Sequence, residues 1–311
     1  MALKDIKNKI KATERTHKVT RAMEAVSAVK MRKTQATALA GRPYARAALS
    51  ILTRLSGSGS LRNHPLMGGL RKSSSESGLT KSKLALVIIT SDKGLAGALN
   101  SGVLKRAAEA LESREVSGVT IYAYGRKGEE YFSRRGYRIA QSFENKNDEV
   151  ALSYMEVLAQ ELSARFIAGD YDKVITVYSN FKSTFEQLPT MRRLLPLSLP
   201  ALKDIVEGIV PAKGKWSHES VLEAPAAYEM EPSGGEVLGV LLPKLIAVSL
   251  YHMLLEAKAS EHSARMVAMK NASDKSREVA HDLTRLFNKI RQAGITREVS
   301  EIVGGREALA E

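Results

Sequence analysis

The last part of the chain carries apolar side chains at helical spacing over an unusual length. Residues 244–303 contain no proline. Apolar or small residues follow one another there mostly at steps of three and four, which is the pattern of one helix face: Leu250, Met253, Ala257, Ser260, Ala264 and Val267, then Val279, Leu283, Leu286 and Ile290. The average α-helix of a globular protein has only about 11 to 12 residues, so a helix of this length indicates a coiled coil or a solenoid. Because the sequence shows no repeat of solenoid length, a coiled coil is favoured.

Residues 2–42 form a second long helical pattern, rich in Ala and Lys and free of proline. Its apolar side chains are Leu3, Ile6, Ile10, Val19, Ala22, Met23, Val26 and Val29. The step from Ile10 to Val19 breaks a strict heptad, so an ordinary amphipathic helix packed on its own domain is the alternative. The simplest assembly is an antiparallel coiled coil in which the two terminal helices bury their apolar stripes against each other.

Between the helical ends, short apolar runs alternate with helical patterns. The runs 84–90, 119–125 and 173–179 have the length of strands, and helices are predicted over about 100–112, up to about 135, and over 148–168. Strands that alternate with helices predict a largely parallel sheet. The predicted fold is therefore α/β: a long antiparallel coiled coil of the N- and C-terminal helices, joined to a central Rossmann-like α/β domain.

The composition of each stretch predicts where these parts begin and end. The Gly/Ser-rich residues in front of the first strand read as a linker or insertion, and the proline-punctuated residues after the last strand read as a connection. The expected domains are the N-terminal coiled-coil helix at 1–55, the linker or insertion at 56–82, the α/β domain at 83–200, the connecting segment at 201–236 and the C-terminal coiled-coil helix at 237–311.

Composition narrows the class of protein. The chain is 44% hydrophobic and 26% charged and has no cysteine, which is typical of a soluble globular protein of a reducing compartment. We expect neither a membrane span nor a signal or transit peptide. The net charge is +13, and residues 1–46 hold twelve Lys and Arg against three acids, a local excess of +9. This excess predicts an acidic partner for the N-terminal helix.

The best candidate for chemistry is the turn "SDKGLAGALN" at residues 91–100, which follows the first strand and precedes a helix. It lacks the GxxxxGK spacing of a P-loop and the GxGxxG spacing of a dinucleotide site, so a structural turn that needs small residues is the favoured interpretation. The six histidines include no pair at i, i+3 or i, i+4, and no GxSxG motif is present. The residues predict a binding or mechanical protein that is not an enzyme and carries no catalytic residue, metal or cofactor.

A nucleic-acid-binding arm on an α/β domain is the rival hypothesis. The basic N-terminal helix would explain affinity for phosphates. However, aromatic residues make up only 5% of the chain and are not interleaved with the basic residues, as stacking on bases would require. This hypothesis also leaves the apolar C-terminal stripe unexplained.

Five motifs, taken in order, resemble the gamma subunit of F-type ATP synthases. They are "THKVTRAMEAVSAVKMRKTQ" (16–35), "ITSDKGLAGALN" (89–100), "YSNFKSTFEQLPTMRRLLPL" (178–197), "ASEHSARMVAMKNASDKS" and "IRQAGITREVSEIVGG". The resemblance covers essentially the whole chain apart from residues 56–82 and about 203–220. The absence of cysteine and of a transit peptide favours a bacterial type over the chloroplast or mitochondrial forms.

The resemblance implies a function and a set of partners. The terminal helices would form the shaft of a rotor, the central stalk, inside a ring of three alpha and three beta subunits. The α/β domain would lie against the epsilon subunit and the membrane ring of c subunits. One copy would serve each complex, at the cytoplasmic side of the bacterial plasma membrane, as a peripheral protein without a cofactor and without nucleic acid. Proton flow would turn the shaft while ATP is made on other chains.

The resemblance also implies which residues meet the alpha and beta ring. On the N-terminal helix these are Met23, Lys30, Arg32 and Lys33, and on the C-terminal helix they are Arg291, Gln292, Thr296, Ile295, Val299 and Ile302. A solvated helix face is the ordinary interpretation of each position. The C-terminal helix is also expected to outrun its partner from about residue 287 onward, which leaves its apolar tip for a surface of the ring to cover.

Overall fold

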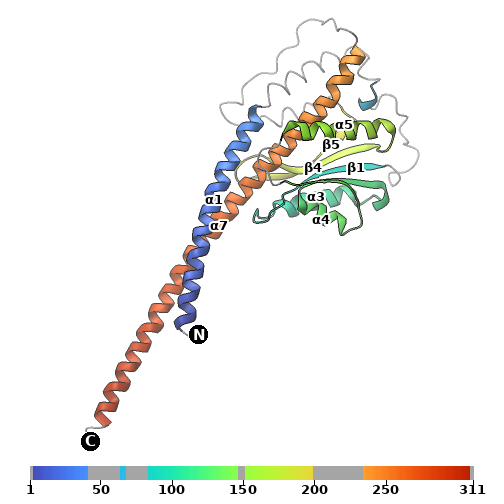
Figure 1. Ribbon diagram of the computed structural model, residues 1–311. Helices are drawn as coiled ribbons and strands as arrows, with labels where there is room; N and C mark the ends of the chain where they lie inside the picture. Colours follow the sequence, from blue (N-terminus) through green and yellow to red (C-terminus); the bar gives the residue numbers. More distant parts are fainter. Residues whose placement is uncertain (1–2, 41–63, 68–82, 146–150, 199–233, 309–311) are drawn as a thin grey trace. The chain divides into compact units, whose positions relative to one another are not determined.

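The computed structural model describes residues 3–40, 64–67, 83–145, 151–198 and 234–308 (Figure 1). The chain divides into two compact units. One contains residues 1–28 and 265–311, the other contains residues 29–264, and each is described by itself below. Most of the predicted linker and nearly all of the predicted connecting segment lie outside the described residues.

The larger unit is built on a five-stranded sheet with strand order β3-β2-β1-β4-β5. The strands are β1 (Leu84–Ile89), β2 (Val119–Tyr124), β3 (Arg138–Phe143), β4 (Lys173–Phe181) and β5 (Gln187–Leu195). β1 pairs in parallel with β2 and β4, β2 pairs in parallel with β3, and β5 runs antiparallel to β4. The prediction of a largely parallel sheet is confirmed, and the three predicted strands correspond to β1, β2 and β4.

The two strands that the sequence pattern missed, β3 and β5, both lie at the edges of the sheet. β1 is buried at every position and therefore appears in the sequence as a continuous apolar run. β3 instead contains Arg138, Gln141 and Ser142, and most of its residues are half-buried or exposed. Pro189 lies within β5, and a proline is tolerated in an edge strand because no ladder hydrogen bond is lost there.

Helices cover both faces of the sheet. On one face α3 (Leu99–Leu111) and α4 (Arg126–Ser133) bury an apolar core around Val103, Leu111 and Phe132. On the other face α5 (Leu152–Ala168) and the first part of α7 (Gly234–Ala308) bury a second core that includes Leu162 and Leu250 (Figure 1). Short 3-10 helices occupy Pro65–Met67 and Val116–Gly118.

Helix α7 starts ten residues before the proline-free stretch and contains Pro243 in its third turn. Proline has no N–H to donate to the carbonyl of Gly239, and the exposure of Gly239 leaves that carbonyl near solvent. By length and composition alone α7 is apolar enough to cross a membrane, but 56% of its most apolar window is buried inside the protein. That degree of burial is typical of the core helix of a domain, as the packing on the sheet shows.

In the smaller unit, the first part of α1 (Leu3–Ala40) pairs with the second part of α7. The buried or half-buried positions of α1 here include Ile6, Ile10, Thr13, His17, Thr20, Glu24 and Ser27, which form an unbroken heptad, and Met23 and Ala28 beside it. The predicted seam was therefore right at Ile6, Ile10 and Met23 and wrong at Leu3, Val19, Ala22 and Val26. Val19 and Val26 are 58% and 54% exposed, and Val29, in the other unit, is 66% exposed. The buried Thr20 hydroxyl donates to Thr16 and His17 carbonyls of its own helix, so a polar residue can occupy the seam without an unsatisfied donor.

Candidate functional site

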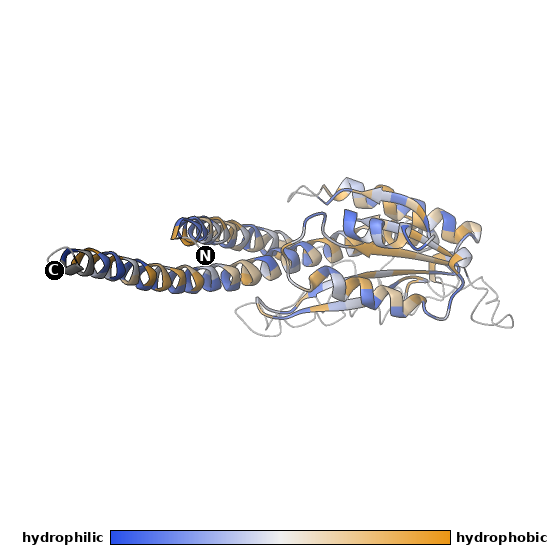
Figure 2. Cartoon of the chain, turned by 90° about the horizontal axis from the view of Figure 1, so that it is seen from below, coloured by the Kyte–Doolittle hydropathy of each residue, from blue (hydrophilic) through white to orange (hydrophobic). Residues whose placement is uncertain are grey.

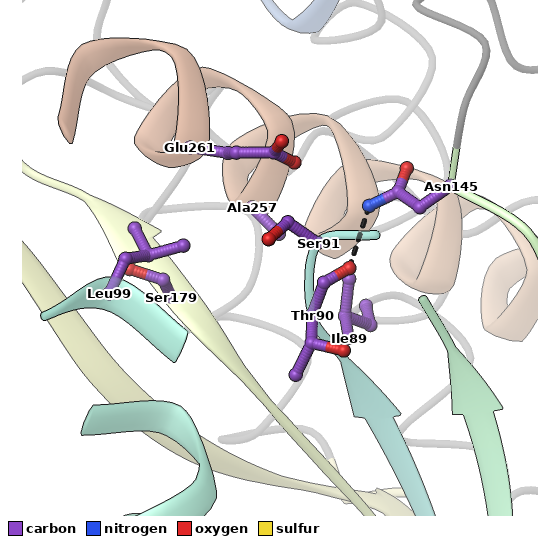
Figure 3. A pocket seen from close by; sticks show the side chains of 8 residues that line it. All are labelled: Ile89, Thr90, Ser91, Leu99, Asn145, Ser179, Ala257 and Glu261. Atoms are coloured by element: carbon purple, nitrogen blue, oxygen red, sulfur yellow. Dashed lines mark hydrogen bonds between the residues drawn. The ribbon is translucent and has the colours of Figure 1, made fainter. Parts of the chain in front are cut away.

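The carboxyl ends of β1 and β4 form the place where an α/β sheet of this kind usually binds a ligand. Strand order reverses there, because β2 and β3 follow β1 on one side and β4 lies on the other. Open α/β sheets bind ligands in the crevice outside such a switch point. Here the crevice is lined by Ile89, Thr90, Ser91, Leu99, Asn145, Ser179, Ala257 and Glu261 (Figure 3).

Helix α7 occupies this crevice. Ala257 and Glu261 project from α7 toward the ends of β1 and β4 (Figure 3), and both are more than nine-tenths buried. The remaining recess has no space for the centre of a water molecule. The position at which related architectures hold a nucleotide is therefore filled by the protein's own helix.

Thr90 joins the ends of three strands at this edge. Its N–H donates to the Tyr124 carbonyl at 2.7 Å, and its carbonyl accepts from Asn145 Nδ2 at 2.8 Å. Its hydroxyl accepts from the Gly128 N–H at 2.8 Å and lies 3.2 Å from the Gly125 carbonyl, to which it donates. Thr90 is thus bonded to the segments that follow β2 and β3.

The polar residues of "SDKGLAGALN" are also used within the protein. The Asp92 carboxylate accepts from the backbone N–H of Arg126 and from that of Asn145, both at 2.8 Å. Because Arg126 begins α4, the carboxylate also lies at the positive end of a helix dipole. Asn100 accepts from the Ser91 N–H at 3.1 Å and donates to the Ser91 hydroxyl at 2.7 Å. These contacts support the interpretation of the motif as a structural turn.

Backbone geometry explains two small residues of this edge. Gly125 has φ +99°, and a Cβ placed on it would meet the Thr90 carbonyl oxygen at 2.1 Å, so only glycine fits. Gly97 has φ +57° within the turn. Next to it Leu95 adopts φ 65° although it is not a glycine, and its side chain is 61% exposed. The sequence pattern did not single out Leu95.

Electrostatics at this edge affect one tyrosine in particular. Burial raises the pKa of Tyr124 to about 12, and the charges of Asp92 and Tyr154 act in the same direction. The buried side chain of Tyr124 also stacks on Phe143 with ring centroids 5.9 Å apart. The edge therefore keeps this tyrosine protonated.

The predicted contact residues of α1 lie on or near its surface. Arg32 and Lys33 are exposed, and Met23 and Lys30 are half-buried. The exposed Val26 and Val29 precede this basic cluster on α1. The helix thus presents apolar and positively charged side chains together.

The predicted contact residues of α7 lie near its C-terminal end. Arg291, Gln292 and Thr296 are exposed, and the Thr296 hydroxyl donates to the Gln292 carbonyl at 3.0 Å. The apolar side chains that follow are more than half exposed: Ile295, Val299, Ile302 and Val303. Figure 2 shows hydrophobic and hydrophilic positions interspersed along the C-terminal part of α7. The ten predicted residues form two groups on two helices, and their contact with a ring stays a prediction.

Comparisons of the sequence with known proteins agree along the whole chain. A protein-family model described as ATP synthase matches residues 2–309. The ATP synthase gamma chain of Pelotomaculum thermopropionicum is 38% identical over 99% of this chain and 99% of its own length. That of Roseiflexus castenholzii is 39% identical over 99% of this chain and 98% of its own length.

Comparisons of the structure agree as well. A chain from the central stalk and c-ring of the Tetrahymena thermophila mitochondrial ATP synthase has a TM-score of 0.55 and 25% identity, covering 82% of this chain and 99% of that one. A chain from the Euglena gracilis mitochondrial ATP synthase, solved with F1, OSCP and c-ring, has a TM-score of 0.63 and 16% identity, covering 99% and 94%. At that identity the second likeness shows the fold alone. None of these named proteins supports the nucleic-acid hypothesis.

Proposed function

The chain belongs to the family of ATP synthase gamma chains, and from this premise we propose that it is the non-catalytic rotor shaft of a bacterial F-type ATP synthase. It couples proton flow through the membrane c ring to conformational change at the beta subunits, where ATP is made. Its partners are the alpha and beta subunits, the epsilon subunit and the c ring. One copy works in each complex, as a peripheral protein at the cytoplasmic side of the plasma membrane.

A shaft acts on a remote catalytic site by contacting its alternative conformations unequally. A partner shifts a conformational equilibrium only by the difference between its binding free energies for the two states. A helix with the same surface all round would contact three equivalent sites equally. The exposed faces of α1 and α7 differ instead, because Val26, Val29 and the basic cluster lie on α1 and the apolar tip lies on α7.

The observation that carries the proposal is the closed crevice between β1 and β4. The one place where this fold would ordinarily hold a nucleotide contains Ala257 and Glu261 of α7 and no space for water. The chain therefore keeps a nucleotide-binding architecture while its own long helix fills the site. This supports a mechanical role, with the ATP chemistry on other chains.

Reconstitution tests the proposal directly. The chain is combined with alpha, beta and epsilon subunits of a bacterial enzyme, and the complex is returned to vesicles that contain the membrane sector. We expect copurification of one copy per complex, ATP hydrolysis only by the complex, and ATP-driven acidification of the vesicles. Two results would overturn the proposal. One is ATP hydrolysis by the isolated chain. The other is a complex that hydrolyses ATP equally well without the chain and pumps no protons when the chain is present.

A further inference from the structure

Helix α7 buries a row of polar residues, two of which bond to the β4–β5 hairpin, within a stretch that also buries Lys258, Glu261 and His262. The row consists of His252, Glu256, Ser260 and Ser263, spaced by four, four and three residues, and all four are more than nine-tenths buried. We call these residues the polar stripe. They belong to the same unit as the sheet, and apolar neighbours such as Leu250, Met253 and Ala257 accompany them.

Glu256 is bonded to the sheet through a directional chain of hydrogen bonds. Arg192 Nε, from β5, donates to the hydroxyl oxygen of Tyr178, from β4, at 2.9 Å. The hydroxyl keeps its own proton, since burial, followed by the charge of Glu256, raises the pKa of Tyr178. That proton is donated to the Glu256 carboxylate. Three elements of the fold thus meet at one buried tyrosine.

The two serines of the polar stripe bond to the same hairpin, whereas His252 Nε2 is buried without a hydrogen-bond partner. The Ser260 hydroxyl donates to the Ser179 carbonyl at 3.0 Å, and the Ser263 hydroxyl donates to the Thr184 carbonyl at 2.7 Å. His252 Nε2 lies 3.3 Å from a Glu256 oxygen. Two serines therefore fix the hairpin backbone directly, one and two turns after Glu256.

The buried Glu256 carboxylate stabilises the fold less than an apolar residue at the same position would. Glu256 Oε2 is buried without a hydrogen-bond partner, and a buried charge contributes less than a well-packed apolar residue of the same size. The best-attested use of such groups is to select one register between packed elements. Apolar contacts could re-form after α7 slides by one turn, about 5.4 Å, but directional bonds could not.

A one-turn shift shows how specific the polar stripe is. A shift in one direction would place the Glu256 carboxylate against the Ser179 carbonyl oxygen, where two acceptors repel. A shift in the other direction would place Ala264 there, which has no hydroxyl to donate. Only the observed register places a donor of α7 against the Ser179 carbonyl; the Thr184 carbonyl also accepts from Gln187 Nε2 of its own hairpin, at 2.9 Å.

We propose that Glu256, bound through Tyr178 to Arg192, is the positioning residue that locks the register of the shaft helix α7 on the sheet, so that a torque on the α/β domain turns α7 without slip. The proposal rests on the rotor function proposed above. It assigns the lock to contacts between α7 and the sheet within this chain.

The register can be measured in the full chain without other subunits. The chain has no cysteine, so spin labels on Lys244→Cys in α7 and Glu112→Cys beside α3, both exposed positions, report one distance by pulsed electron paramagnetic resonance. We expect a single distance in the parent. Tyr178→Phe and Glu256→Ala should each add a second population displaced by about 5 Å, one helical turn. Glu256→Gln, which keeps an acceptor for Tyr178, should restore the single distance.

Tyr171→Phe is the matched control, because it also removes a hydrogen-bonded hydroxyl from a buried tyrosine. The Tyr171 hydroxyl, however, bonds to Tyr122 and not to α7. It should lower the melting temperature and leave the distance unchanged. A single parent distance in both Tyr178→Phe and Glu256→Ala overturns the proposal, since the polar stripe would then add stability only.

The link to rotation is measured in the reconstituted complex. Tyr178→Phe should lower the number of protons pumped per ATP hydrolysed by about twofold or more, while Tyr171→Phe should not. If a variant shows the second label-to-label distance but pumps the parent's number of protons per ATP, the link between the register of α7 and torque is overturned. If the parent chain fails to restore pumping at all, the proposed function fails, and the distance measurement still decides the register.

Discussion

The imidazole Nδ1 of His17 lies 2.9 Å from the carbonyl oxygen and 2.9 Å from the hydroxyl oxygen of Ser273, although 256 residues separate the two positions. This contact fixes the antiparallel register of α1 and α7 in the smaller unit. Counted 14 residues from the contact along each helix, Leu3 lies opposite Phe287. The part of α7 that follows has no partner in the described part of α1.

The free tip of α7 should therefore behave differently alone and in a complex. An isolated helix of about 12 to 15 residues is marginal in water, so in the free chain residues from about 287 onward should exchange amide hydrogens rapidly. Assembly with alpha and beta subunits should protect them, and deleting residues 304–311 should leave assembly intact. Hydrogen exchange with mass spectrometry measures both states. Strong protection of residues 295–303 in the free chain would contradict this prediction.

The basic cluster of α1 should matter for coupling more than for folding. Replacing Lys30, Arg32 and Lys33 together by Gln should change the free energy of unfolding by no more than about 0.5 kcal/mol at each of the exposed Arg32 and Lys33 and by about 1 kcal/mol at the half-buried Lys30. Rotation rate or proton coupling of the complex should change clearly. The same triple change at the exposed Lys4, Lys7 and Lys11 serves as the control. A sharp loss of stability with normal coupling would assign the cluster to the fold.

The turn at residues 91–100 should bind no nucleotide. Its polar groups bond within the protein, and the crevice beside it is filled by α7. Isothermal titration of the purified chain with ATP and Mg²⁺ should show no heat of binding at millimolar concentration. Micromolar binding that is abolished by Gly94→Ala together with Gly97→Ala would show that the structural interpretation of the turn is wrong.

Gly125→Ala should destabilise the larger unit strongly. The new Cβ would meet the Thr90 carbonyl oxygen, and φ is unfavourable as well, so we expect a loss of about 3 kcal/mol or more in the free energy of unfolding. Gly136→Ala is the control, because its φ is +79° but no atom lies near the added Cβ. It should cost about 1 kcal/mol. Urea unfolding measures both, and equal losses would show that the close approach to Thr90 is unimportant.

Stability should fall at alkaline pH. The pKa of Tyr124 is about 12 in the folded chain and 10.0 in the unfolded chain, so the unfolded state loses its proton first as the pH rises. The contribution of Tyr124 to the free energy of unfolding is therefore constant below pH 10. Between pH 10 and 12 it declines by up to about 1.4 kcal/mol per pH unit. Tyr124→Phe should flatten this decline without changing the pH dependence below 9. If the free energy of unfolding declines equally steeply with pH in the parent and in Tyr124→Phe, Tyr124 is not the cause of the decline.

Several of these features followed from the sequence, and others could not. β1 and β2 were predictable because central strands buried on both faces appear as apolar runs. β5 was not, because an edge strand tolerates Pro189 and exposed side chains. The seam of α1 was mistaken because apolarity favoured Val19 and Val26. The structure buries Thr20 and Ser27 instead, and a small side chain whose hydroxyl bonds within its own helix gives no apolar signal.

The predicted site residues show the same limit. Met23, Arg32 and Thr296 were proposed from a family resemblance, and exposure alone does not distinguish them from other helix surface positions. Within the polar stripe, Ser260 lies in the predicted helical stripe, but nothing in the sequence marks His252 and Glu256, which at helical spacing look like one side of an exposed helix. Only the tertiary contacts with Tyr178 and Arg192 give these residues a role.

The helix in the crevice between β1 and β4 also bears on inhibition. A compound aimed at that crevice would compete with Ala257 and Glu261, which are tethered to the same chain and so have an effective concentration in the millimolar range or above. Free compounds rarely reach that concentration in a cell. Inhibitors of this chain are therefore better directed at exposed apolar side chains of the larger unit, such as Phe185 and Leu188, which no helix of the described residues covers.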